Sequence, residues 1–151
     1  MKNITLTLLA LLSIITASQA QDEASTPLQT VLEQYIKIQT ALAADSLKGI
    51  PEAAAALASA AKENAGVLPE ATASQAEAVA KATDIKAARA AFKPLSTTLI
   101  AAATDQKEKT GRYYEAFCPM AGAAWIQADR KVANPYYGAS MLTCGEIRKE
   151  L

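Results

Sequence analysis

The chain contains no histidine and no excess of charge of either sign. Without histidine there are no Ser/His/Asp or Cys/His catalytic pairs, no zinc sites built on imidazole and no histidine-ligated haem. The 15 Lys and Arg residues balance 15 Asp and Glu residues, whereas proteins that bind nucleic acid or anionic membranes carry surplus basic residues. We therefore predict a protein that is not an enzyme, uses no organic cofactor and does not bind nucleic acid.

Long apolar runs are missing after the N-terminus. Residues 1–20 are typical of a secretory signal peptide, with Lys2 as the basic residue, a mostly apolar stretch from Ile4 to Ile15, and small residues around Ala20. The stretch is short for a transmembrane span, and no cysteine follows it as in a lipoprotein. We predict cleavage after Ala20, a periplasmic location and no membrane insertion after cleavage; an uncleaved N-terminal anchor is the alternative.

Residues 26–109 are rich in good helix formers, which predicts a lean helical bundle that serves as scaffold. Thr26 and Pro27 suit the start of a helix, whose apolar stripe recurs at three- and four-residue spacing: Leu28, Val31, Leu32, Tyr35, Ile38 and Leu42. Further helices are expected from Ile50 to Ala61, over residues 72–81, and after a cap at Asp84. Pro94 predicts a kink in the last helix or its break into two.

The composition changes at Gly111. The segment from there to Cys144 holds the only Trp, both Cys, two of the three Met, and four of the five tyrosines: Tyr113, Tyr114, Tyr136 and Tyr137. Turn-forming residues divide it, and a short helix is expected over residues 119–130. The predicted fold is therefore all-α: a small up-and-down helical bundle over 26–109, then an irregular, turn-rich segment over 111–151 with one short helix, in a single domain over 21–151.

Two short motifs hold all the sulfur outside the predicted signal peptide. They are Cys118-Pro119-Met120 and Met141-Leu142-Thr143-Cys144. Two thiolates and two thioethers form a soft donor set, which selects Cu(I) or Ag(I) over hard ions. If the loops bring the motifs together, Cys118, Met120, Met141 and Cys144 are candidate ligands for such a metal.

Other interpretations of these residues remain open. In an oxidising compartment Cys118 and Cys144 form a disulfide by default, and methionines are usually core fillers. Trp125 and Phe117 could anchor the segment on the bundle. Alternatively, a binding surface for a partner could be formed by Trp125, Tyr136 and Tyr137. A thiol oxidoreductase is the least favoured alternative, because neither Cys belongs to a C-x-x-C motif or lies in an alternating strand pattern.

Four stretches closely resemble the signature of a bacterial periplasmic family of unknown function: Tyr114 to Ala121, Ala124 to Ile126, Asn134 to Gly138, and Met141 to Gly145. That family occurs as stand-alone exported proteins and as a domain attached to adaptor subunits of heavy-metal efflux systems. The helical half is similar as well, around residues 35–42 and 90–96, so the resemblance covers nearly all of the chain after the predicted signal. Ile126, where the family more often has Leu, is a small departure.

The resemblance implies an association with copper and silver efflux, and it carries Cys118, Met120, Met141 and Cys144 over as candidate ligands. The expected function is a periplasmic Cu(I)- or Ag(I)-binding protein that acts as a buffer or as an accessory to efflux. Its partner would be a heavy-metal efflux adaptor or another periplasmic protein. The alternative is a non-enzymatic interaction module that contains a Cys118–Cys144 disulfide and no metal.

Overall fold

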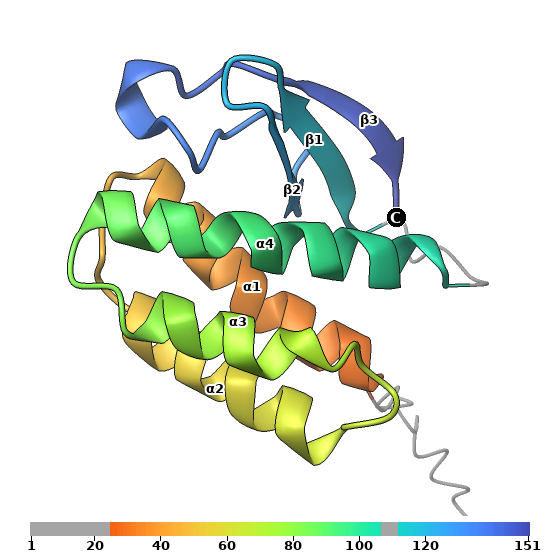
Figure 1. Cartoon of the computed structure of the whole chain (residues 1–151). Coiled ribbons are helices and arrows are strands. Elements are labelled where there is room, and N and C mark those ends of the chain that lie inside the picture. The colour runs from red at the N-terminus through yellow and green to blue at the C-terminus, as the bar shows by residue number, and fades with distance from the viewer. Residues whose placement is uncertain (1–24, 107–111) are drawn as a thin grey trace, which may run out of the picture.

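The computed structural model describes residues 25–106 and 112–151, and the predicted signal peptide lies outside these ranges. Four helices precede three strands (Figure 1). The elements are α1 (Pro27–Ala43), α2 (Ile50–Glu63), α3 (Ala71–Ala80), α4 (Ile85–Thr104), β1 (Tyr114–Cys118), β2 (Ala123–Gln127), the 3-10 helix η1 (Gly138–Ser140) and β3 (Glu146–Glu150). Within the described ranges, no helix is long and apolar enough to cross a membrane.

Two predicted helix starts are confirmed by their caps. At the start of α1, Gln29 N donates to Thr26 Oγ1 (3.2 Å) and Thr26 N donates to Gln29 Oε1 (2.8 Å). At the start of α4, Ala87 N donates to Asp84 Oδ1 (2.8 Å). Each cap satisfies a backbone N–H that has no partner within the helix, so local sequence is enough to set these boundaries.

Helix α4 is continuous through Pro94, so the predicted break into two helices does not occur. A proline removes one backbone hydrogen bond, to the carbonyl four residues earlier. Here both Pro94 and Ala90 are exposed, and water can bind the carbonyl that is left without a partner. The apolar face of the same helix, which includes Phe92, Leu95 and Leu99, is fully buried and favours one continuous helix.

The all-α prediction is wrong, because the C-terminal part is a sheet and the fold is mixed α/β. The three antiparallel strands have the order β2-β1-β3. The helix expected over residues 119–130 is instead a turn, in which Gly122 has φ +53° and Gly122 N donates to Pro119 O (3.1 Å), followed by β2. Strand β2 is almost wholly buried, so it lacks the polar–apolar alternation that marks a half-exposed strand.

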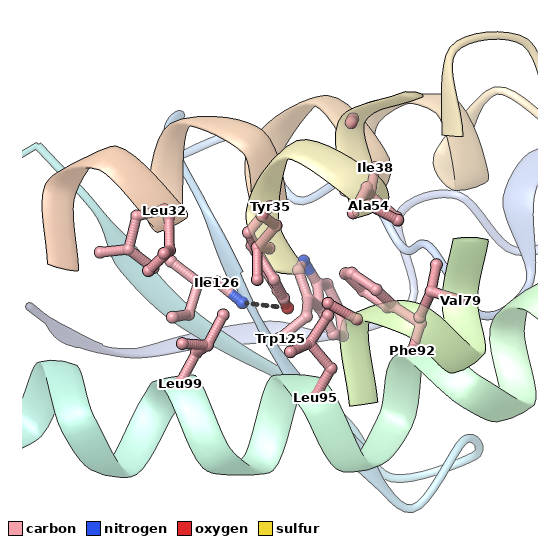
Figure 2. Close-up of a cluster of buried hydrophobic side chains, with 14 of the residues drawn as sticks. Leu32, Tyr35, Ile38, Ala54, Val79, Phe92, Leu95, Leu99, Trp125 and Ile126 are labelled. Atoms are coloured by element: carbon pink, nitrogen blue, oxygen red, sulfur yellow. Dashed lines mark hydrogen bonds between the residues drawn. The ribbon is translucent and has the colours of Figure 1, made fainter. Parts of the chain in front are cut away.

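The sheet packs on α1 and α4, and α2 and α3 lie on the far side of these two helices (Figure 1). One contiguous core includes residues of the helices and of the sheet. In Figure 2, Trp125 and Ile126 of β2 lie among Tyr35, Phe92 and Leu99 from the helices. The four helices and the C-terminal sheet therefore share a single core.

A buried tyrosine joins the two parts. The hydroxyl of Tyr35 in α1 accepts a hydrogen bond from Ile126 N in β2 (3.2 Å; Figure 2) and lies 2.7 Å from Ser96 Oγ in α4. Burial raises the pKa of Tyr35 well above its usual range, so the hydroxyl stays protonated. A residue of the predicted apolar stripe thus also holds the sheet to the bundle.

Candidate functional site

Cys118 and Cys144 meet although they are 26 residues apart in sequence. Both are free cysteines, and their Sγ atoms lie 2.7 Å apart. A disulfide bond is about 2.05 Å long, so oxidation of the two thiols could bond the sulfur atoms with only a small movement of either residue. We call these two residues the sulfur pair.

Strand pairing brings the sulfur pair together. Cys118 is the last residue of β1, and Phe117 pairs with Glu146 at the start of β3. Cys144, two residues before Glu146, therefore lies beside the end of β1. Asn134 holds the backbone around Cys144 in this position, because its Nδ2 donates to Cys144 O (2.8 Å) and its N donates to Leu142 O (2.8 Å).

The two sulfur atoms have different surroundings. Cys118 is fully buried, whereas Cys144 is half-buried. Ala121 N donates to Cys118 Sγ (3.4 Å), the side chain of Asn134 also hydrogen-bonds to this sulfur, and Met120 N contacts both sulfur atoms.

These contacts shift the two thiol pKa values in opposite directions. Burial would raise the pKa of Cys118, but the hydrogen bonds from Cys144, Ala121, Met120 and Asn134 outweigh it, so the pKa is lowered. The hydrogen bond that Cys144 gives to Cys118 raises the pKa of Cys144. Of the two thiols, Cys118 therefore has the lower pKa and loses its proton more readily than Cys144.

The two predicted methionines lie on turns next to the sulfur pair. Met120 is 66% exposed, and its carbonyl oxygen accepts a hydrogen bond from Tyr137 Oη (3.1 Å). Met141 is half-buried, and its carbonyl accepts from Cys144 N (3.0 Å). No group of three or more His, Cys, Asp or Glu among the described residues could hold a metal ion, so a site here with more than two protein ligands would draw on methionine sulfur.

The three aromatic residues predicted to form a binding surface differ in how far they are buried. Trp125 is fully buried, so its assignment to a binding surface is wrong and it anchors the sheet on the bundle instead. Tyr136 is half-buried, with its ring centroid 6.0 Å from that of Trp125 and its hydroxyl donating to Ala124 O (2.8 Å). Tyr137 is also half-buried and links the turn at Met120 to the segment after Asn134.

Cys144 opens onto a surface depression. Its lining comes from the end of β1 and the start of β3: Phe117, Pro119, Cys144, Gly145 and Glu146. The guanidinium of Arg148 lies 3.5 Å from the ring centroid of Phe117. Of the sulfur pair, only Cys144 lines this depression.

Sequence reasoning missed three residues that position the segment leading to Cys144. In the sequence, Asn134 indicates only a turn and the start of one of the four stretches of the family signature, and nothing distinguishes Arg89 or Asp45. Arg89 of α4 donates to Pro135 O (2.7 Å), to Leu42 O at the end of α1 (2.9 Å) and to Asp45 Oδ1 (2.6 Å). Only the Asn-Pro dipeptide hinted at an ordered turn, because the partners of Arg89 are far away in sequence.

Asp45 completes this arrangement from a left-handed backbone conformation, with φ +54°. Its Oδ2 accepts a hydrogen bond from Ala139 N (2.8 Å), and this bond and the one from Arg89 lower the pKa of the carboxyl group. Glycine is favoured at position 138 beside it, because the backbone there has φ +56° and a Cβ would collide with the carboxylate of Asp45. The Arg89–Asp45 pair thus ties both helices to the segment that carries Met141 and Cys144.

Replacing Asp45 with asparagine is expected to lower the melting temperature at pH 7, because the charged bond to Arg89 is lost. Because the pKa of Asp45 is lowered, the carboxylate stabilises the fold at pH values above 3.8, the ordinary pKa of an aspartate side chain. This contribution is lost as the pH falls through the pKa of Asp45 in the folded protein. Melting curves of both proteins between pH 7 and pH 3 should therefore converge at the acidic end. A gap that is independent of pH would contradict this role of the charge.

Comparison with known proteins identifies a family but no described relative. Residues 31–111 match the family described as "Protein of unknown function (DUF3347)". No curated protein and no solved structure matches the chain. The matched stretch includes most of α1 and all of α2, α3 and α4, and it ends before the sulfur pair. The family therefore adds no evidence about the Cys and Met signature or about metal efflux. Because the match covers more than half of the 151 residues, the chain belongs to the DUF3347 family.

Proposed function

We propose that this protein binds Cu(I) or Ag(I) in the periplasm through Cys118 and Cys144, with Met120 and Met141 as additional ligands. It would buffer the metal or pass it to a heavy-metal efflux system. The observation that supports this proposal best is the meeting of two thiols from distant segments, 2.7 Å apart, between two turns that carry the methionines. Thiolate and thioether sulfur favour soft, monovalent metals.

The surroundings of the sulfur pair suit metal binding. Metals bind the thiolate form of cysteine, and the hydrogen bonds to Cys118 favour that form. Two sulfur atoms on one ion lie up to about 4.6 Å apart, taking about 2.3 Å for each metal–sulfur bond. The pair would have to open, and Cys144 is the residue to move, because it is half-buried and lies between η1 and β3.

Native mass spectrometry of the protein after anaerobic reduction tests this proposal. We expect one Cu(I) per chain, with affinity measured by competition against a chelator. Cys144→Ser should weaken binding at least tenfold, and Met120→Leu and Met141→Leu should each weaken it less. Thr143→Ala, at an exposed position beside Cys144, is the matched control and should bind as the wild type does. A Cys144→Ser protein that binds with wild-type affinity would refute the ligand set.

A second candidate is a disulfide-stapled interaction module without metal, which would bind an efflux adaptor or another periplasmic protein. The short distance between the sulfur atoms favours it, as does the oxidising compartment that the predicted signal peptide implies. The bond would close a loop of about 27 residues and stabilise the fold by roughly 3–4 kcal/mol. The same spectra decide between the two: a mass about two daltons low as isolated, with no specific copper uptake after reduction, supports the module.

A further inference from the structure

We propose that the oxidised sulfur pair exchanges with external monothiols at one sulfur only. Cys144 is the sulfur that is attacked, and Cys118 is the leaving group. This activity goes beyond the proposed function because it needs no metal. It follows from the unequal burial and hydrogen bonding of two sulfur atoms that are close enough to bond.

Access selects Cys144. Thiol–disulfide exchange begins when a thiolate attacks one sulfur of the bond, and it depends on which sulfur the thiolate can reach. Cys118 has no exposed surface, because it lies at the end of β1 within the core. Cys144 is half-buried and lines the depression between Phe117 and Glu146. An incoming monothiol therefore meets Cys144 first.

Hydrogen bonding selects Cys118 as the leaving group. Ala121 N lies 3.4 Å from Cys118 Sγ, and the buried side chain of Asn134 hydrogen-bonds to the same sulfur. Both donors contact Cys118 Sγ in the unbonded pair, so they stabilise the negative charge that Cys118 acquires when the disulfide bond breaks. Asn134 is held in turn, since its Oδ1 accepts from Tyr136 N (2.8 Å) and its Nδ2 donates to Cys144 O (2.8 Å).

The reaction balances in two steps. The monothiolate RS⁻ forms a bond to Cys144 Sγ while the bond between the two cysteines breaks, and the electron pair of that bond leaves with Cys118 as a thiolate. A second RS⁻ then attacks the R sulfur of the mixed disulfide, which releases RSSR and the Cys144 thiolate. Two monothiols are oxidised and the protein disulfide is reduced.

Trapping the intermediate tests the assignment. The wild-type protein is oxidised with diamide, exposed briefly to reduced glutathione, quenched with acid and alkylated with N-ethylmaleimide. Trypsin cleaves at Arg130 and Lys131, which separate the two cysteines for peptide mapping. We expect glutathione on Cys144 and maleimide on Cys118, in a ratio of at least ten to one. Glutathione on Cys118, an even split, or failure to form either the disulfide or a mixed disulfide would overturn the proposal.

Single variants test access directly. Cys118→Ser and Cys144→Ser are each treated with oxidised glutathione, and the adduct on the remaining cysteine is timed. We expect the adduct to form at least tenfold faster on Cys144, with far-UV circular dichroism confirming that both variants are folded. In urea the two rates should agree within about twofold, because unfolding removes the difference in access. Equal rates in the folded proteins would contradict the inference. Titration of the same samples with copper tests the proposed metal binding separately.

Discussion

Replacing Trp125 with alanine is expected to lower the free energy of unfolding by about 3–5 kcal/mol. The indole is fully buried, its Nε1 donates to Gln127 Oε1 (2.9 Å), and its ring meets that of Tyr136 edge-on. Truncation would leave a cavity where the sheet packs on α1 and α4, and it would leave Gln127 without one of its hydrogen-bond partners. The large loss of stability is expected because the substitution removes both apolar packing and a hydrogen bond at one position.

Urea denaturation followed by far-UV circular dichroism measures this effect. Because the core is contiguous, the helices should unfold in the same transition as the sheet, at a lower urea concentration than in the wild type. Trp125→Phe keeps most of the apolar volume and should cost less than half as much. A helical signal that the alanine variant leaves unchanged would mean that helices and sheet unfold independently.

Replacing Gly145 with alanine is expected to destabilise the fold and to displace Cys144. Gly145 has φ +141°, a conformation that glycine adopts and other residues rarely do. A Cβ would lie 2.8 Å from Trp125 Cη2 and 3.0 Å from Phe117 O. The indole is held in the core and the carbonyl belongs to β1, so neither can move easily. Backbone strain costs about 1–3 kcal/mol, and overpacking adds about 1–3 kcal/mol.

Gly122 provides the matched control for Gly145. It also has a positive φ, +53°, but a Cβ there would meet no atom within 4 Å. Gly122→Ala should therefore cost only about 1–2 kcal/mol, the penalty of the left-handed conformation. We also expect Gly145→Ala, but not Gly122→Ala, to slow disulfide formation between the sulfur pair, as followed by thiol titration after oxidation. Equal losses in the two variants would show that the contact with Trp125 is unimportant.

Sequence reasoning succeeded where structure depends on near neighbours. The caps at Thr26 and Asp84 and the apolar stripes of the helices are repeated local signals, so the helical half could be read residue by residue. The family match over residues 31–111 also falls on this half. The resemblance found in the sequence rests mainly on the Cys and Met motifs after residue 113, which lie outside the matched residues.

The same reasoning failed where structure depends on distant partners. Strand β2 is buried on both sides and lacks alternation, and β3 is largely charged, so neither shows the pattern of a typical strand. Both are strands because β1 lies between them and supplies hydrogen bonds to each. The sequence leaves an anchor and a binding surface both open for Trp125, and only the packing of β2 on α1 and α4 places its indole in the core.

The sequence by itself determined the four helices, the absence of imidazole chemistry and the supply of soft sulfur atoms, because these depend on composition and on spacing within a few residues. Only the tertiary structure decided that Cys118 and Cys144 meet, that one is buried and the other accessible, and that Asn134 and the Arg89–Asp45 pair hold their surroundings. Pairing of β1 with β3 closes a long loop, and its register follows from the packing of the whole sheet on α1 and α4, which no local pattern encodes.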